Sequence, residues 1–380
     1  MTSEERREAR YQRRKAKRMA KRKEKLEKYT FERVISPKYL FNAAKEAAKG
    51  VRWKSSVQRY LLHLTKNTGR THKRLRNGED IRRGFICFDI MERGKLRHIQ
   101  SVHFSERVVQ KSLCRNALVP ILTNGLIYDN GASQKGKGTK FATDRLVKQL
   151  VRHIRRHGRK GGALLIDFSD YFGNVDHDVI REIYNRAIED ERLRDFAMLF
   201  VDAFDRGLGL GSETSQINAI ILANRADHFA KEVLRLKAYV RYMDDTIILH
   251  EDMDYLRHCL TELKKIYEAR GIIVNDRKTK ICDLKHGFTY LKTRFFITES
   301  GHIIKKPCRD SITRERRRLK GHKRLLDARM ITIKEIETSY QSWRGSMKYR
   351  DAHNALKRMD KLYYSLFGVK PHNKKSKKAR

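Results

Sequence analysis

The sequence predicts a mixed α/β fold class, in which helices and strands alternate along the chain. Short apolar runs such as Ala163-Leu164-Leu165-Ile166 have the length and composition of buried strands. Two further runs, 238–240 and 246–249, flank a short polar break and predict a tight hairpin. Longer segments with apolar residues at helical spacing lie between these strands. Helices and strands that alternate within one globular region belong to the α/β or α+β class.

The N-terminal segment 1–28 carries 13 lysines and arginines and five glutamates, with almost no apolar residues. Because it has no apolar face to bury, it is predicted to be a basic disordered arm, or helical only on a partner. An RNA-binding arm and a solubilising tail both have this composition. The last residues, 369–380, predict a second basic tail.

The first half of the globular region contains helices around a pair of strands. Its patterns predict a basic helical region at 29–64, followed by two strands at 85–90 and 97–102 that are joined by Glu92-Arg93-Gly94-Lys95. Two later helices are predicted to begin at Glu106 and after Gly138.

In the second half, apolar runs predict strands at 163–167, 238–249 and 288–297, with helices between them. The stretches 311–328 and 333–366 are helical in pattern and rich in lysine and arginine. They predict a separate basic helical bundle.

Charge and cysteine content restrict the partners and the compartment. The 380 residues include 87 Lys+Arg against 45 Asp+Glu, a formal charge of +42. Self-repulsion opposes such an excess, so a polyanionic partner is predicted, with binding that weakens steeply as salt rises. No apolar stretch is long enough for a membrane span. The five cysteines are widely spaced and form no C-x-x-C, which predicts reduced thiols in a cytoplasmic protein.

Three aspartates carry the strongest chemical signal. Asp167 ends the apolar run at 163–166, and Asp244 and Asp245 are adjacent at the tip of the predicted hairpin. Adjacent carboxylates repel each other, so folding alone does not favour them there unless a cation is near. One aspartate at a strand end plus a pair at a hairpin tip is the arrangement that holds two Mg²⁺ ions for phosphoryl transfer, with Mn²⁺ as a possible substitute.

The string Asp167-Phe168-Ser169-Asp170-Tyr171-Phe172-Gly173-Asn174-Val175-Asp176-His177 resembles the first metal-binding motif of reverse transcriptases, especially those of group II introns and related prokaryotic elements. With the hairpin Arg241-Tyr242-Met243-Asp244-Asp245, the resemblance covers roughly 85–360 in the correct motif order. It implies a right-hand polymerase with fingers at 29–160, a palm at 161–300 and a helical thumb at 301–368. It also implies that metal ions are held by Asp167, the Phe168 carbonyl, Asp244 and Asp245, and that Tyr242 and Met243 contact nucleic acid.

Several further residues gain a role from the same resemblance. Phe172 is implied to lie under the sugar of the incoming nucleotide and to exclude a 2′-hydroxyl, although a core position would explain it too. Arg97, with Lys95 and Arg93 as neighbours, is implied to grip the triphosphate in the fingers. A solvated basic loop is the alternative for each of these cations.

The glycine-rich turn narrows the resemblance. Most members of the family read Gln-Gly-x-x-x-Ser-Pro here, whereas this chain reads Leu210-Gly211-x-x-x-Ser215-Gln216. That form is associated with reverse transcriptases of diversity-generating retroelements. Leu210, Gly211 and Gln216 are then predicted to contact the incoming nucleotide, and an aliphatic Leu210 should lower fidelity.

The remaining motifs are weaker. Lys278, in an Asn-x-x-Lys-Thr segment, is a candidate to protonate or stabilise the leaving pyrophosphate, or is an ordinary surface lysine. Lys135 and Lys137 are predicted to position the template, and the segment 288–295 is predicted to be a primer-gripping hairpin. Trp343 is predicted to face a duplex from the thumb, or to be thumb core.

These observations predict an RNA-directed DNA polymerase that uses an RNA template, a DNA or RNA primer and dNTPs, with a structured RNA and an accessory protein as possible further partners and no membrane. The predicted type is error-prone and diversity-generating. A defence-associated or phage-encoded reverse transcriptase, a catalytically idle RNA-binding scaffold and a DNA-templated polymerase remain as alternatives.

Overall fold

The computed structural model of the chain describes residues 2–92 and 94–372. The chain forms two compact units whose segments interleave. Unit 1 comprises Met1–Lys135, Phe168–Leu234 and Thr261–Asn275, and unit 2 comprises Gly136–Asp167, Arg235–Leu260 and Asp276–Arg380. The domains predicted from the sequence follow one another, so they differ from these units. The reason is that the sheet of unit 2 takes its strands from three separate stretches of the chain.

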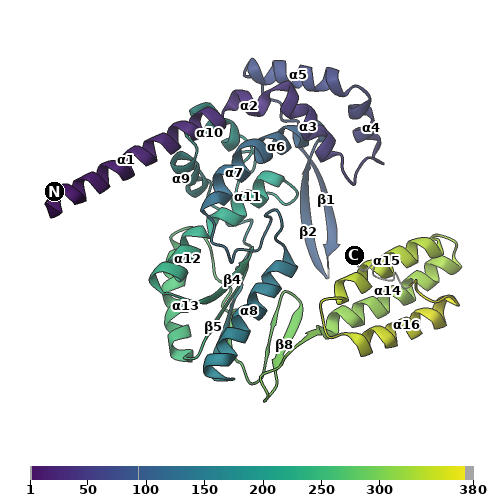
Figure 1. Cartoon of the computed structure of the whole chain (residues 1–380). Helices are drawn as coiled ribbons and strands as arrows, with labels where there is room; N and C mark the ends of the chain where they lie inside the picture. The colour runs from purple at the N-terminus through teal and green to yellow at the C-terminus, as the bar shows by residue number, and fades with distance from the viewer. Residues whose placement is uncertain (1, 93, 373–380) are drawn as a thin grey trace, which may run out of the picture. The chain divides into compact units, whose positions relative to one another are not determined.

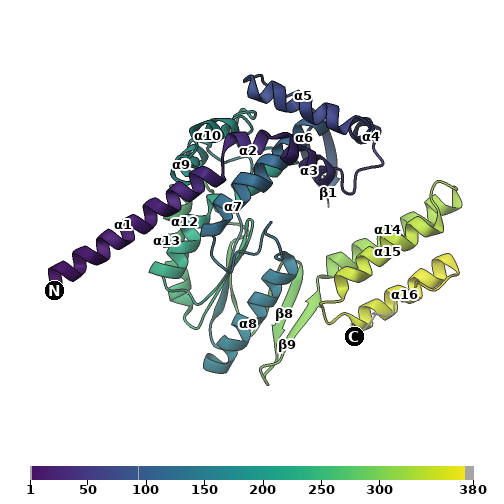
Figure 2. The same cartoon turned by 45° about the horizontal axis from the view of Figure 1, so that its top comes forward.

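The N-terminal segment is a helix, α1 (Ser3–Lys28), so of the two predictions for 1–28 the disordered arm is wrong, and a helix stabilised by a partner stays a prediction (Figures 1 and 2). A capping box starts α1, in which the Thr2 side chain accepts from the Glu5 amide and the Glu5 side chain accepts from the Thr2 amide. Its interior is rich in Glu, Lys, Arg and Ala, which are good helix formers. Near its C-terminal end, Arg22 Nε lies 2.5 Å from Glu189 Oε2 of the same unit. The sequence analysis allowed a helix here only on a partner because the segment has no apolar face.

The rest of unit 1 is mostly helical. Its helices pack around buried aliphatic residues such as Leu40, Val108 and Leu118, each 0% exposed. In order, its α-helices are α2 (Phe31–Ile35), α3 (Pro37–Ala47), α4 (Ser55–Leu62), α5 (Leu64–Arg76), α6 (Phe104–Leu113), α7 (Val119–Leu122), α9 (His177–Ala187), α10 (Glu191–Met198), α11 (Glu213–Leu222) and α12 (Asn224–His228). Shorter π or 3₁₀ turns lie at Cys114–Leu118, Thr123–Gly125 and Phe229–Val233.

A two-stranded antiparallel ribbon completes unit 1. It consists of β1 (Phe85–Glu92) and β2 (Lys95–Val102), paired from Phe85 opposite Val102 to Glu92 opposite Lys95 (Figure 1). Both strands were predicted, and each continues to the loop at their tip. β1 is largely exposed, and the Phe85 ring at its base stacks on Phe204 with the ring centroids 4.8 Å apart. The ribbon is therefore anchored at its base.

Unit 2 is built on a four-stranded antiparallel sheet. Its strands are β3 (Gly162–Ile166), β4 (Ala238–Tyr242), β5 (Asp245–His250) and β6 (Lys280–Asp283), in the spatial order β4-β5-β3-β6. The predicted helix after Gly138 is α8 (Thr139–His157), which packs against β4 (Figure 1). The shared core lies between helix and sheet and includes Leu146, Leu150, Val240 and Ile247. A further helix, α13 (Met253–Glu268), starts in unit 2 and ends in unit 1.

A second, smaller sheet in unit 2 contains β7 (Phe288–Tyr290), β8 (Thr293–Ile297) and β9 (Ile303–Pro307) in that order. The predicted hairpin at 288–295 is therefore present. Its turn is Leu291-Lys292, and both residues have positive φ, 45° and 58°. Left-handed backbone in non-glycine residues is strained.

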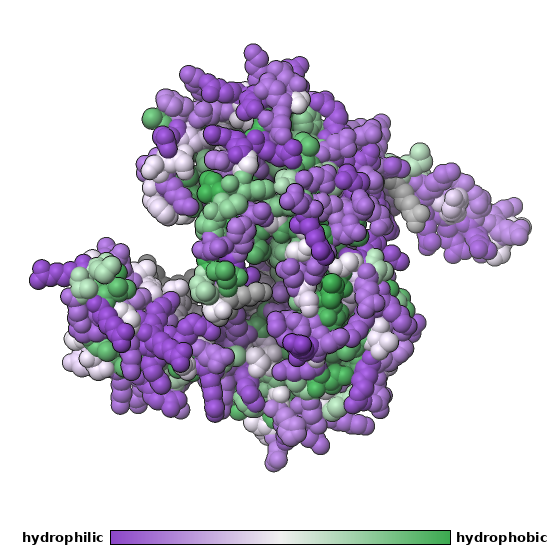
Figure 3. Space-filling view, turned by 180° about the vertical axis from the view of Figure 1, so that it is seen from behind, coloured by the Kyte–Doolittle hydropathy of each residue, from purple (hydrophilic) through white to green (hydrophobic). Residues whose placement is uncertain are grey.

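Three helices form the predicted basic bundle: α14 (Arg309–Asp327), α15 (Ile333–Met347) and α16 (His353–Phe367). Two helical stretches were predicted, but the second breaks between α15 and α16. Leu319, Ile336, Tyr340 and Tyr363, all 0% exposed, form the centre of its core. Seen from behind, the bundle and α1 each present mainly hydrophilic side chains (Figure 3).

The bundle is attached to the three-stranded sheet by polar contacts within unit 2. Arg350 Nε donates to Thr293 Oγ1 at 2.9 Å. The Asp351 amide donates to the Lys305 carbonyl at 2.7 Å, and the Lys305 amide donates to the Asp351 carboxylate at 2.7 Å. Among the described residues, no helix is both long and apolar enough to cross a membrane.

Candidate active site

The Tyr-Met-Asp-Asp hairpin forms as predicted. Tyr242 pairs with Asp245 at the end of the β4–β5 ladder, so Met243 and Asp244 form a two-residue turn. Met243 has φ 55°, in the left-handed region that methionine seldom adopts. Two-residue hairpin turns favour positive φ because their twist matches that of the strands. Here Met243 takes the positive φ that the turn requires. This turn holds Asp244 and Asp245 at the tip of the hairpin.

Arg241 stabilises this turn and was missed by the sequence analysis. Its side chain is fully buried, at 0% exposed, and Nη1 donates to the Met243 carbonyl at 3.1 Å. A guanidinium that donates to a backbone carbonyl in a buried setting forms a strong charge-assisted bond. The signal in the sequence is an arginine inside an apolar strand, between Val240 and Tyr242.

Tyr290 supports the other side of the hairpin from β7. Its hydroxyl donates to the Asp245 carbonyl at 3.4 Å, a long hydrogen bond. Burial raises the pKa of Tyr290 well above its usual range, and the neighbouring Asp245 carboxylate acts in the same direction. The hydroxyl therefore keeps its proton and remains a donor.

Asp167 directly follows β3, at the end of the strand where prediction placed it. Its amide donates to Thr279 Oγ1 at 3.2 Å, which ties the strand end to the segment that contains Lys278. Lys278 Nζ lies 3.1 Å from Asp167 Oδ2 as an ion pair. The approach lacks hydrogen-bond geometry, and within the described chain that buried oxygen has no hydrogen-bond partner. The structure thus brings Lys278 beside a predicted metal ligand.

The three aspartates interact electrostatically. The pKa of Asp245 is raised to about 7, first by burial and then by the charges of Asp244 and Asp167, while Lys278 opposes the shift. Negative charge at this end of the sheet therefore exceeds the positive charge that compensates it. Carboxylate oxygens in such a place suit a hard divalent cation. Within the described ranges, no three acidic, histidine or cysteine side chains already stand in the geometry of a metal site.

Phe168, whose carbonyl was a predicted metal ligand, belongs to unit 1. It forms an isolated β-bridge with Val274. Its ring is 4% exposed, stacks on Tyr171 at 5.1 Å and meets Tyr267 edge-on at 4.8 Å between centroids. The side chain is a core residue, so only its backbone is available for a ligand.

Phe172 also lies in unit 1 and is half-buried rather than fully in the core. Its carbonyl accepts from the Leu208 amide at 2.8 Å. Gly207 packs against the same carbonyl with φ 68°, and a Cβ there would lie 2.5 Å from the Phe172 oxygen. The backbone at Phe172 is thus held closely, while part of its ring faces solvent.

The glycine-rich turn lies against the β1–β2 ribbon. The Gln100 amide of β2 donates to the Leu210 carbonyl at 3.3 Å, and Gly211 has φ 117°. Leu210 is half-buried, whereas Gly211 and Gln216 are exposed. Gly211 and Gln216 line a cavity of about 420 Å³ in unit 1.

The cations predicted for the fingers lie on or beside β2. Arg97 lies on β2 and forms an ion pair with Glu92, with Nε 2.7 Å from Oε2. The backbone of Lys95 pairs with Glu92, and its side chain lies outside the described part of the chain, as does Arg93.

Four residues were predicted to contact nucleic acid in addition to Met243. Lys135 is exposed, Tyr242 is half-buried, and Lys137 places its ammonium 5.2 Å from the centroid of the Phe141 ring. Trp343 is different. Its ring is 8% exposed, lies in the core of the three-helix bundle and stacks on Tyr340 at 5.7 Å. The prediction that Trp343 faces a duplex is therefore wrong, because the bundle needs its apolar area inside.

Residues 89–295 match the family model described as reverse transcriptase (RNA-dependent DNA polymerase). The chain belongs to the reverse transcriptase family. The predicted fold class, a mixed α/β right-hand polymerase, is confirmed by this membership together with the helices and strands described above. The enzyme class predicted from the sequence is the class of this family.

Solved structures similar to this reverse transcriptase include two telomerases. One is apo telomerase from Candida tropicalis truncated from its C-terminal domain, at 14% identity and a TM-score of 0.45, covering 58% of this chain and 55% of that chain. The other is telomerase from Candida albicans in complex with a TWJ fragment of telomeric RNA, at 11% identity and a TM-score of 0.47. That match covers 75% of this chain and 61% of the telomerase chain. This chain thus spans less than two thirds of either. No curated protein matches the sequence.

Reverse transcriptases use divalent metal ions, and the carboxylates of this one fit that requirement. Asp167 Oδ2 is paired with Lys278 but has no hydrogen bond within the described chain. Burial and two neighbouring carboxylates raise the pKa of Asp245, so a cation at this place would stabilise its charged form. Asp167, Asp244, Asp245 and Lys278 all belong to unit 2, whereas Phe172, Leu210 and Arg97 belong to unit 1.

Proposed function

We propose that this chain copies RNA into DNA by two-metal nucleotidyl transfer. The observation that carries the proposal is the meeting of Asp167, Asp244 and Asp245 at one end of the four-stranded sheet, in a chain whose residues 89–295 match the reverse transcriptase family. Substrates are an RNA template, a DNA or RNA primer and dNTPs.

Each carboxylate has a distinct place in this proposal. Asp167 presents its side chain from the end of β3, and Asp244 and Asp245 present theirs from the turn that Arg241 and Tyr290 hold. Together with the Phe168 carbonyl they would hold two Mg²⁺ ions. When bound, such ions lower the pKa of the primer 3′-hydroxyl and stabilise the charge on the triphosphate.

Lys278 is proposed to act on the leaving group. Its side chain is 66% exposed, and Nζ lies 3.1 Å from Asp167 Oδ2. An ammonium so placed is close to the carboxylates and still able to reach outward. It can donate a proton to the departing pyrophosphate, or stabilise that charge as a cation.

The experiment is primer extension by the purified chain on one sequence supplied as RNA and as DNA template, with Mg²⁺, with Mn²⁺ or with a chelator. Metal-dependent extension on the RNA template is expected. Asp167→Asn is the matched inactive control, since it keeps size and shape. Extension on DNA alone would favour a DNA-templated polymerase, and RNA binding without extension would favour the scaffold.

The aromatic ring of Phe172 is proposed to exclude ribonucleotides. Its half-buried ring, on a backbone held by Gly207 and Leu208, supports a wall that is both rigid and accessible. Phe172→Ala should raise the incorporation efficiency of ribonucleotides relative to deoxynucleotides. An unchanged ratio would make Phe172 a structural residue.

The error-prone, diversity-generating type is proposed from Leu210. Its contact with β2 is through its backbone carbonyl, so Leu210→Gln should leave the turn in place. A polar side chain there would favour the correct base pair, and one such contact is worth roughly 1–3 kcal/mol. Leu210→Gln should therefore lower misincorporation, most plainly opposite template adenine. The measurement is error frequency per template base in the cDNA, and equal spectra would favour the defence or phage alternative.

A structured RNA and an accessory protein are proposed as partners of this activity. The charge of +42 supports an RNA partner beyond a short template, because few of those cations are needed at the aspartates. Sequencing cDNA made by the purified chain with its co-purifying RNA identifies template and primer together. Random cDNA without a recurrent start site would argue against a dedicated structured RNA.

A further inference from the structure

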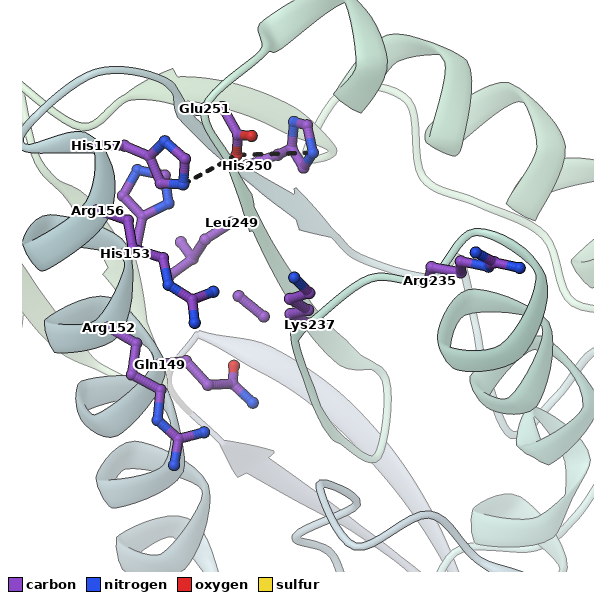
Figure 4. Close-up of a pocket in the computed structure, with 11 residues that line it drawn as sticks. Gln149, Arg152, His153, Arg156, His157, Arg235, Lys237, Leu249, His250 and Glu251 are labelled. Carbon is purple, nitrogen blue, oxygen red and sulfur yellow. Dashed lines mark ion pairs between the residues drawn. The ribbon is translucent and has the colours of Figure 1, made fainter.

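A cavity of about 480 Å³ lies in unit 2 between α8 and the β4–β5 hairpin (Figure 4). Ala238 and Leu249, which pair with each other, line it. That pair is at the opposite end of the ladder from Tyr242 and Asp245. The cavity is therefore separate from the carboxylates, although both are built on the same two strands.

Basic side chains dominate one part of the cavity. Arg152 and Arg156 extend from one face of α8, and Lys237 precedes β4 on the facing side. Figure 4 shows Arg156 and Lys237 pointing into the same space, with Arg152 nearby and Arg235 turned away. Arg152, Arg156 and Lys237 are all exposed, and in the described parts of the chain neither Arg152 nor Arg156 has a carboxylate partner. Uncompensated guanidinium groups of this kind suit phosphate.

The acidic residue that lines the cavity lies apart from these cations. Glu251 is 3.8 Å from His157 Nε2 and 3.7 Å from His250 Nε2. Figure 4 shows this group at the end of the cavity away from Arg152. The Glu251 carboxylate thus approaches the two imidazoles and forms no ion pair with Arg152 or Arg156 within the described chain.

Gln149 adds a neutral polar group to the wall. Its Nε2 donates to the Tyr239 carbonyl at 3.3 Å, which fixes the amide plane. Its Oε1 is buried and has no hydrogen-bond partner among the described residues. Such an orphaned acceptor is costly unless a donor is supplied. In Figure 4 this oxygen faces the space that Arg156 enters.

We propose that this cavity binds a ribose–phosphate segment of RNA. The cations would take the phosphates, and a ribose 2′-hydroxyl would donate to Gln149 Oε1. The 2′-hydroxyl is the group by which a protein tells RNA from DNA at a given position. A DNA strand would satisfy the cations and leave the glutamine oxygen unbonded. The site would hold RNA at a second point, at the opposite end of the hairpin from the Asp244 turn.

The first experiment compares two double variants that remove the same charge from the same helix. Arg152→Gln/Arg156→Gln changes residues that line the cavity, and Lys148→Gln/Arg155→Gln changes exposed residues of α8 that do not. Binding of a 20-nucleotide single-stranded RNA is measured across a salt series. If both arginines contact phosphate, the log–log salt slope should fall by about 1.4 units in the cavity variant, since each contact on a single strand contributes about 0.7. The control should keep its slope.

The second experiment tests the glutamine. Gln149→Met keeps the size of the side chain and removes the acceptor. In this variant, the affinity for the 20-nucleotide RNA divided by the affinity for DNA of the same sequence should fall towards one, the value for a site that does not distinguish them. A thermal melt of the variant monitors folding. Photo-crosslinking of the same RNA to the wild-type chain, followed by peptide mapping, should label 149–157 or 237–250.

Two outcomes would overturn the proposal. Equal loss of slope in both double variants would show that α8 attracts RNA only through diffuse charge. Absence of crosslinks to 149–157 and 237–250, with labelling elsewhere, would show that the cavity does not take RNA. Neither result depends on polymerase activity, because binding and crosslinking are the readouts.

Discussion

Unit 2 contains two hairpins with two-residue turns, and they use backbone strain differently. In β4–β5 the turn residue Met243 is left-handed, and in β7–β8 both Leu291 and Lys292 are. Both β5 and β8 pair with strands on both sides, but β5 is buried along its middle, whereas in β8 buried and more exposed residues alternate. The strained turn of β4–β5 is additionally held by Arg241.

The difference teaches where strain is functional. A turn on a well-buried strand can be held in an unfavourable conformation by the groups around it. The β4–β5 turn uses that support to keep two repelling carboxylates in place. The β7–β8 turn carries no pair of carboxylates, so its backbone strain is expected to lower stability without contributing to catalysis.

The largest expected effect is that of Asp244→Asn. Nucleotide addition should fall to background, because fewer carboxylates remain to hold the ions. The free energy of unfolding should be unchanged or higher, since repulsion of Asp245 is relieved. Primer extension and urea denaturation measure the two. Near-normal extension would show that the β4–β5 turn is not the active site.

Arg241→Met should be the most destabilising change in this comparison. It removes the bond to the Met243 carbonyl and leaves that group without this donor. A hydrogen bond to a charged group contributes about 1.5–3 kcal/mol, and a loss of this size is expected in urea denaturation. Arg241→Lys should cause an intermediate loss of stability, because lysine keeps the positive charge but lacks the planar set of guanidinium donors. A loss below about 0.5 kcal/mol, typical of surface positions, would mean that the turn holds itself.

Tyr290→Phe tests the contact by which β7 supports the β4–β5 hairpin, the proposed active site. The expected loss of stability is at most about 1 kcal/mol, because its 3.4 Å hydrogen bond is long. The extension rate should fall more than the small stability loss explains, since the Asp245 backbone is less well positioned. Thermal unfolding and extension at low temperature separate these effects. An unchanged rate would limit Tyr290 to packing.

The smallest effects are expected from glycine in the two turns. Lys292→Gly should raise stability by up to about 1 kcal/mol, because relief of left-handed strain outweighs the entropy that glycine loses on folding. Met243→Gly should give a similar gain but a slower extension. Thermal melts and extension rates on both variants provide the test. If Met243→Gly keeps the full rate, strain in the β4–β5 turn has no function and the two hairpins are equivalent in this respect.

The parts of the site set by local sequence were predictable. Asp167 follows an apolar run, and Met243-Asp244 interrupts two others, so strand ends and turn follow from short-range patterns. Asp244 and Asp245 stand out because their repulsion has no folding benefit. The β1–β2 ribbon and α8 were found for the same reason, from local periodicity.

What was missed depends on burial. Arg241 looks like one basic residue among 87 until its neighbours enclose it. Trp343 was predicted either to face a duplex or to be thumb core, and only the packing of three helices decides which face of α15 is inside. Gln149 has no motif, and its significance comes from an oxygen that tertiary contacts leave unbonded. α1 was predicted only as an alternative, because its helix-forming composition was given less weight than the lack of an apolar face.

The interleaving of the two units has a consequence for synthesis on the ribosome. The central sheet cannot close until β6, at Lys280–Asp283, joins β3. At about 5–20 residues per second, β3 leaves the ribosome many seconds before that partner exists. Its apolar edge meanwhile invites pairing with other chains. Nascent chains halted between β5 and β6 should therefore be captured by chaperones or aggregate, and slower growth at low temperature should favour recovery of intact protein.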